Sequence, residues 1–160
     1  RPNYDIKKII CLTEEAVETL YLLGRESLIC GVSAFVNRPK EAQKIEKVSL
    51  FTSSNYKKIQ KHNADLILGH SDIQKDIARD LVELGHNVFI ANHRGINEIL
   101  KYITLLSRLV DEKEKGEAVT KALTEAVSAG GVGGVVGAIA IQNLLNQTGT
   151  KTQTTATKGK

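Results

Sequence analysis

Four runs of apolar residues, each followed by a segment with helical periodicity, most strongly limit the folds open to this chain. The runs occupy residues 6–12, 27–33, 65–69 and 87–91, and they show no regular alternation of polar and apolar side chains. Strands that are buried on both faces have this pattern. The sequence therefore predicts an α/β fold: an open parallel sheet of about four strands with helices on both faces and right-handed crossovers. Residues 34–54 are expected to form a long connection.

The segments between the runs carry the boundary signals of helices. Thr13 is a plausible N-cap for the first helix, and Ser71 with Gln74 has the spacing of a capping box. The helix that follows is expected to end at Gly85, and a longer helix is expected over about residues 96–110. The residues expected on the inner faces of these last two helices are Ile77, Ala78, Leu81, Val82 and Leu84, then Ile96, Ile99, Leu100, Ile103, Leu106 and Leu109.

The distribution of charge argues against a nucleic-acid partner. The net charge is +4, but no acidic residue follows Glu125, whereas Lys151, Lys158 and Lys160 do. Most of the basic excess therefore belongs to the C-terminal tail, and the body lacks the clustered cations that displace counterions from a phosphate backbone. The two cysteines, Cys11 and Cys30, lie in apolar runs and are expected to be buried thiols, although a bridge between neighbouring strands is conceivable.

The composition changes towards the C-terminus. We expect residues 1–111 to form the α/β lobe, residues 112–129 a charged, Ala-rich connecting helix, and residues 130–160 a Gly-rich apolar segment with a low-complexity Thr/Lys tail. The glycines lack the spacing of a nucleotide-binding loop. Their small-residue faces suit close packing, so self-association through residues 130–147 is expected; a lipid-facing segment or a flexible linker remains an alternative.

Polar residues follow each of the four predicted strands. Parallel strands bring their carboxyl ends to one edge of a sheet, which is where ligands bind in open α/β folds. Some of these residues also have the ordinary roles of turn and cap residues. The candidate ligand-binding residues are Thr13, Glu14, Ser33, Phe35, Asn37, Ser71, Asp72, Asn92, His93 and Arg94.

Catalytic and metal-binding constellations are not expected. Glu14 and Glu15 are adjacent at a helix start and point apart, and Cys11 lies inside a strand, where a thiolate is disfavoured. His70 and His93 end neighbouring strands and could approach one another, but two histidines without a carboxylate make a weak metal site. We therefore predict a binding protein that is not an enzyme, with no catalytic residue, metal ligand or cofactor.

Five elements in the right order resemble the cobalamin- and siderophore-type substrate-binding proteins of ABC importers, over Lys7 to about Val119. They are the strand, Thr turn and Leu-Gly-ended helix of residues 9–24, the strand at 28–33 with the Pro39-Lys-Glu-Ala42 loop, the Asn55–Ile59 and Asn63–Leu68 block, Ser71–Gln74, and Asn92–Arg94. The resemblance implies one lobe of a two-lobed protein whose facing loops enclose cobalamin or a ferric chelate. The residues from Glu112 onward are similar to the helix that joins the lobes.

The chain departs from this family in two places. The Gly-rich and Thr/Lys segments stand where a second lobe is expected, so a single lobe offers half a cleft. Lys57 stands where the family often carries an acid that docks an ABC transporter permease, which reverses the charge of that contact. The alternative function is a truncated or repurposed lobe, acting as a structural, self-assembling or membrane-associated protein through its C-terminal segment. The resemblance favours an extracytoplasmic or membrane-associated location, although no charged-then-apolar leader is recognised.

Overall fold

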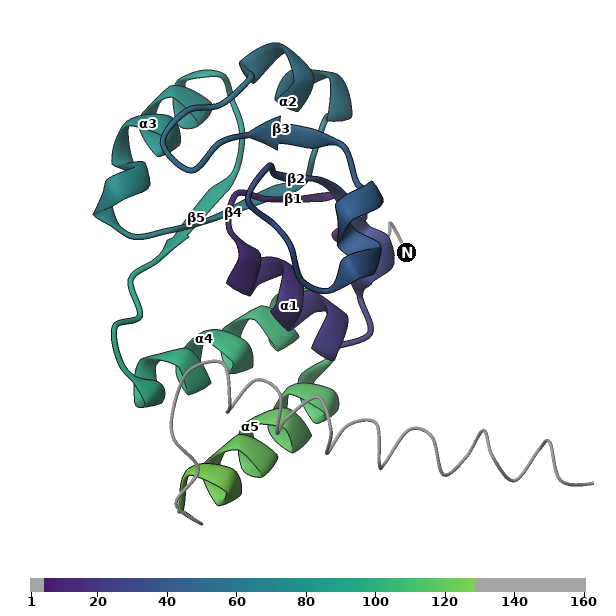
Figure 1. Ribbon diagram of the computed structural model, residues 1–160, viewed down its shortest axis with the longest axis vertical. Coiled ribbons are helices and arrows are strands. Elements are labelled where there is room, and N and C mark those ends of the chain that lie inside the picture. The colour runs from purple at the N-terminus through teal and green to yellow at the C-terminus, as the bar shows by residue number, and fades with distance from the viewer. Residues whose placement is uncertain (1–4, 129–160) are drawn as a thin grey trace, which may run out of the picture. The chain divides into compact units, whose positions relative to one another are not determined.

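The computed structural model describes residues 5–128, which form two compact units that meet in sequence at Tyr102 and Ile103. The first unit contains a five-stranded sheet built from β1 (Ile9–Cys11), β2 (Ile29–Ser33), β3 (Lys47–Ser49), β4 (Leu66–His70) and β5 (Val88–Ala91) (Figure 1). All pairs are parallel, in the order β3-β2-β1-β4-β5. The predicted parallel α/β architecture is confirmed.

The strand β3 was not predicted. It lies within the expected connection of residues 34–54 and contributes three residues to the edge of the sheet, where it pairs with β2. Its sequence, Lys47-Val48-Ser49, is too short to show a period, and one buried Val48 is its whole apolar signal. The sheet therefore has five strands, one more than the four apolar runs indicated.

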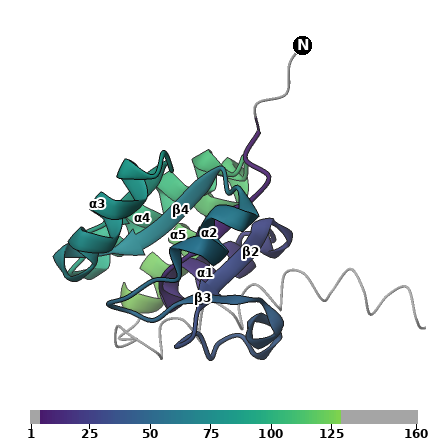
Figure 2. The ribbon, with the colours of Figure 1, turned by 90° about the horizontal axis from the view of Figure 1, so that it is seen from above.

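Helices cover both faces of the sheet. The helix α1 (Glu14–Leu22) lies on one face, and α2 (Tyr56–His62) and α3 (Lys75–Glu83) lie on the other (Figure 1). Figure 2 looks onto the face covered by α2 and α3. Short 3-10 turns at Glu26–Leu28, Lys40–Lys44 and Asp72–Gln74 complete the connections.

The two-sided covering explains why the strands lack alternation. Successive side chains of a strand point to opposite faces, and both faces here are packed. On the face of α2 and α3, one buried apolar cluster contains Ile10, Leu12, Val48, Ile59, Ile67, Ile77 and Leu81. On the other face, α1 buries Ala16, Val17 and Leu20. Cys11 is also fully buried and Cys30 partly so; both thiols are free.

Fewer residues of α3 are buried than predicted, and the buried residues of α4 (Ile96–Leu109) lie in its C-terminal part. In α3, Ile77 and Leu81 are buried, whereas Val82 and Leu84 are exposed and Ala78 is partly exposed. Residues four apart share one face of a helix, and Val82 lies off that line. In α4, Ile103 and Leu106 are buried as predicted, Leu100 is partly buried, and the exposed residues are Ile96, Ile99 and Leu109.

The second unit contains the end of α4 and the helix α5 (Lys113–Ser128), close to the predicted helix of residues 112–129. Asp111 turns the chain between them with a positive φ of 58°. At Gly116 the two segments approach so closely that a Cβ would overlap Oγ and Cβ of Ser107. Among the described residues no helix is long and apolar enough to cross a membrane. The segment 130–147 lies outside the described residues.

The close approach at Gly116 gives a testable prediction. Gly→Ala inside an open helix stabilises by about 1 kcal/mol. Here we expect Gly116→Ala to lower the free energy of unfolding by about 1–3 kcal/mol, because the added methyl group overpacks against Ser107. Urea unfolding of this variant and of the double variant Gly116→Ala, Ser107→Gly measures the effect. The double variant should recover the loss; a stabilised single variant would contradict the packing.

Candidate ligand-binding rim

The carboxyl ends of the strands form one edge of the first unit, because all five strands are parallel. We call residues 13–15, 33–37, 70–74 and 92–94 the strand-end rim. The strands β1 and β4 are neighbours in the middle of the sheet. After β1 the chain continues to β2, towards one edge of the sheet, and after β4 it continues to β5, towards the opposite edge. The loops after the adjacent strands β1 and β4 therefore diverge, and this divergence creates the crevice in which open α/β sheets bind ligands.

The buried amide of Gln74 joins three strand ends. Its Oε1 accepts a hydrogen bond from the N–H of His70 at 2.9 Å. Its Nε2 donates to the carbonyl oxygens of Leu12, after β1, at 3.3 Å and of Phe51, after β3, at 2.9 Å. The side chain is fully buried. Gln74 thus fixes the spacing of the loops that make the rim.

The capping box expected at Ser71 and Gln74 is therefore only half present. The Ser71 hydroxyl accepts from the N–H of Ile73 at 3.3 Å, which is a cap interaction, and α3 begins after one 3-10 turn. Gln74 is drawn away from Ser71 by the three backbone groups that it satisfies. Gly69 leaves room for this amide, since a Cβ there would come within 2.8 Å of Gln74 Oε1.

Replacing Gln74 tests this role. Gln74→Leu keeps the volume but leaves a buried N–H and two carbonyl groups without their partner. We expect the free energy of unfolding to fall by about 1–3 kcal/mol, the usual cost of an unsatisfied buried group. Denaturant unfolding measures this, with the exposed Gln60→Leu as the matched control. Equal stability of the two variants would contradict the proposed link.

A second set of polar contacts joins the loops after β1 and β2. Glu14 accepts hydrogen bonds from the N–H of Asn37 at 2.7 Å and from the guanidinium of Arg38 at 3.0 and 3.1 Å. Arg38 also pairs with Glu18 at 3.1 Å. Burial alone would raise the pKa of Glu14, but the hydrogen bonds from Asn37 and Arg38 together lower it. Glu14 and Asn37 are thus engaged with each other, and they hold this side of the rim in shape.

The remaining predicted site residues divide into buried and exposed groups. Thr13, Ser33 and Ser71 are buried; Ser33 accepts from the Phe35 N–H, and Thr13 Oγ1 has no hydrogen-bond partner within residues 5–128. Asp72 and Arg94 are exposed and form an ion pair at 3.2 Å. Asn92 is exposed.

Two large apolar side chains lie uncovered on the rim. Phe35 is 61% exposed after β2, and Ile73 is 59% exposed after β4. Ile73 was not among the predicted site residues, because a single apolar residue at the start of a helix is usually expected to be buried. Both side chains are thus available for contact with a ligand at this edge of the sheet.

The structure also brings together three groups that sequence reasoning did not combine. One ligand atom from each of Glu15, His70 and His93 lies within 4.8 Å of the others. The rings of His70 and His93 are 4.4 Å apart, and the ring of His93 lies 5.0 Å from that of Tyr102. Burial, and next the neighbouring His70, lower the pKa of His93. Glu15 follows β1 and His70 ends β4. Knowing that these two strands are neighbours would have been enough to predict that the two residues lie close together.

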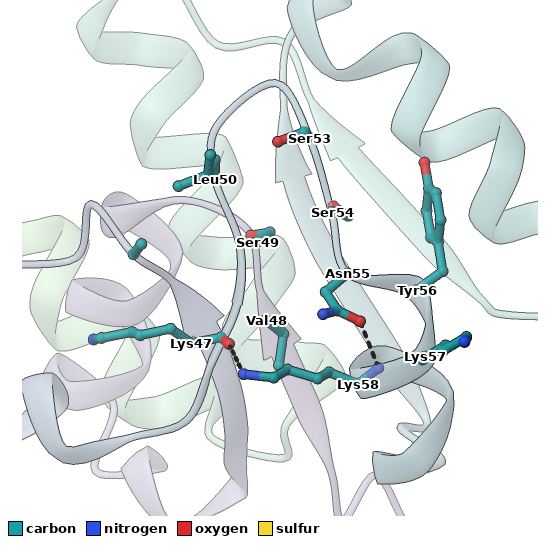
Figure 3. A pocket seen from close by; sticks show the side chains of 11 residues that line it. Lys47, Val48, Ser49, Leu50, Ser53, Ser54, Asn55, Tyr56, Lys57 and Lys58 are labelled. Atoms are coloured by element: carbon teal, nitrogen blue, oxygen red, sulfur yellow. Dashed lines mark hydrogen bonds between the residues drawn. The ribbon is translucent and has the colours of Figure 1, made fainter.

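An open cavity of about 710 Å³ lies beside the edge strand β3, away from that switch (Figure 3). Lysines 47, 57 and 58 line it, together with serines 49, 53 and 54. Lys58 Nζ donates to the carbonyl of Lys47 at 3.2 Å, and the Lys58 N–H donates to Asn55 at 3.1 Å. Lys57, the residue singled out for permease docking, is exposed at this cavity.

Comparisons with known proteins agree with the fold of the first unit. Residues 9–129 match the family model described as periplasmic binding protein. An ABC transporter substrate-binding lipoprotein of Bacillus subtilis, YvrC, is 27% identical over 121 residues, which are 73% of this chain and 38% of the lipoprotein. A vitamin B12-binding protein of Vibrio parahaemolyticus is 25% identical over 129 residues, 79% of this chain and 46% of that protein.

A solved structure shows the same fold. The protein of Staphylococcus epidermidis described as a possible iron-binding periplasmic solute-binding protein superposes with a TM-score of 0.71 at 24% identity, covering 78% of this chain and 50% of the other. The chain thus spans about half, or less, of the length of the proteins it matches. That extent is consistent with one lobe of a two-lobed architecture.

Proposed function

This chain belongs to the periplasmic binding protein family, and we propose that it is a ligand-binding lobe for ABC-type uptake of a corrinoid or a ferric-siderophore-like chelate. The relatives above include an ABC transporter substrate-binding lipoprotein and a vitamin B12-binding protein. On this proposal the protein acts outside the cytoplasm, delivers its ligand to a permease and catalyses no reaction.

The exposed pair Phe35 and Ile73 on the strand-end rim is the observation that carries the proposal. A large chelate offers apolar faces with polar groups at its periphery, and binding sites for such molecules combine apolar walls with a few placed polar groups. Phe35 and Ile73 supply apolar surface, and the Asp72–Arg94 pair supplies hydrogen-bonding groups beside Ile73. These residues come from the loops after β2, β4 and β5.

One rim forms one wall of a binding site, so a second wall has to come from elsewhere. In this proposal it comes from a second lobe or from a second copy of the chain.

The contact with the permease involves another part of the lobe. Lys57 and its neighbours Lys47 and Lys58 present positive charge at the edge of the sheet. They would favour an acidic partner surface. The alternative of self-assembly through residues 130–147 concerns a segment outside the described residues.

Calorimetric titration of the folded protein with cyanocobalamin and with a ferric siderophore tests the proposal. We expect heat from one of the two ligand classes. Phe35→Ala and Ile73→Ala should each weaken that binding at least about tenfold, because truncating a large anchor at the centre of a binding surface costs about 2 kcal/mol or more. Val82→Ala is the matched control, since Val82 is also 59% exposed but lies on α3 outside the rim.

Two results would count against the proposal. A folded sample that gives no heat with either ligand class would remove the function as stated. Equal weakening by Val82→Ala would show that the loss reflects a general effect on the protein, not a contact made by the rim.

A further inference from the structure

We propose that Glu15, His70 and His93 form a binding site for one divalent transition-metal cation of the zinc type, held by the chain itself without a chelator. This inference does not rest on the proposed uptake of a chelate. It concerns a second ligand chemistry at the same edge of the sheet. The expectation of no metal ligand considered the two histidines alone, and the structure adds the carboxylate that they lacked.

The three groups converge because of the topology. Glu15 lies in the first turn of α1, directly after β1, and His70 is the last residue of β4. The strands β1 and β4 are adjacent and parallel, so both side chains stand at the point where the loops diverge. His93 follows β5, which pairs with β4. Three neighbouring strands therefore each contribute one ligand.

The donor set fits zinc and related ions. Two imidazoles and one carboxylate are the protein ligands of many zinc sites that keep a fourth position open for water or another ligand. Tetrahedral donors about 2.1 Å from such an ion lie about 3.4 Å from one another. The present ligand atoms lie within 4.8 Å of one another, so side-chain rotations that bring them closer by up to about 1.4 Å would complete the coordination.

The hydrogen bonding of His70 prepares it to bind. Its Nε2 lies 3.1 Å from the carbonyl oxygen of His93. Since a carbonyl can only accept, Nε2 must donate, which leaves the lone pair of the neutral ring on Nδ1. Metal-bound histidines commonly donate their second ring N–H to a carbonyl group in this way, and the bond fixes the tautomer and orientation of the ring.

His93 has a ring nitrogen without a partner beside the other two ligand groups, whereas the similarly unpartnered Nε2 of His86 has no such neighbours among residues 5–128. The Nδ1 of His93 is buried and finds no hydrogen-bond partner within the described part of the chain. The ring is held between His70 and the buried Tyr102, at centroid distances of 4.4 and 5.0 Å. A buried nitrogen without a partner is unfavourable. A cation bound at Nδ1 would satisfy it.

The test uses the full chain without an affinity tag that contains histidine, stripped of metal by a chelator and then titrated with Zn²⁺ by calorimetry. We expect one Zn²⁺ per chain. Glu15→Gln, His70→Gln and His93→Gln should each weaken the affinity at least about tenfold, as loss of a ligand or of its orientation does. Matched controls are Glu83→Gln and His86→Gln, which lie at the far end of α3 and after it.

Cobalt supplies a second readout that does not depend on stability. With Co²⁺ in place of Zn²⁺, the wild-type protein should show the visible absorption bands of a four- or five-coordinate site, and each of the three variants should change or lose them. Thermal melts without metal identify any variant that fails to fold, and the remaining variants then decide.

The proposal is overturned by no Zn²⁺ binding to the folded wild-type protein, by binding that all three ligand variants retain, or by equal loss in the controls. Weak binding of several ions with an octahedral Co²⁺ spectrum would show adventitious binding at surface carboxylates, and it would overturn the proposal equally.

Discussion

The hydrogen bonds of one buried amide hold the strand-end rim together. Gln74 bonds the backbone of β4 with its oxygen and the chain after β1 and β3 with its nitrogen. A parallel sheet aligns its strand ends but does not fix the loops beyond them, because those loops diverge where the chain order reverses. The amide supplies that missing constraint at the switch between β1 and β4. The positions of Glu15, His70 and Ile73 depend on it.

The rim combines rigid and open parts. Hydrogen bonds from Asn37 and Arg38 to Glu14 connect the loops after β1 and β2 and hold that side of the rim in place. Phe35, Ile73 and the Asp72–Arg94 pair remain exposed on the same edge. A rigid sheet that presents a few uncovered side chains is the scaffold that the proposed binding of a large ligand needs.

Sequence reasoning succeeded where the physical signal was repeated along the chain. The unalternating apolar runs predicted the parallel sheet, and Gly24 and Gly85, both at positive φ, end α1 and α3 where helix stops were expected.

Sequence reasoning failed where a segment was too short to show a period, or where one pattern was compatible with two structures. Three residues of β3 carry no period, and Val82 lies one position beyond the buried stripe of α3. The spacing of Ser71 and Gln74 is typical of a capping box, and only the three-dimensional structure shows that Gln74 instead bonds the backbone of three strand ends. Glu15 and His70 lie at strand ends that the sequence predicted. Their proximity depends on the pairing of β1 with β4, and the sequence pattern does not predict which strand lies beside β1.

The central claim is that the loops after β1, β2, β4 and β5 act as one binding surface. Amide chemical-shift mapping of the ¹⁵N-labelled protein, titrated with cyanocobalamin and separately with a ferric siderophore, tests it most directly. The account predicts perturbations concentrated at residues 13–15, 33–38, 70–74 and 92–95. Perturbations confined to the lysine-lined cavity at residues 47–58, or scattered over both ends of the sheet, would contradict it.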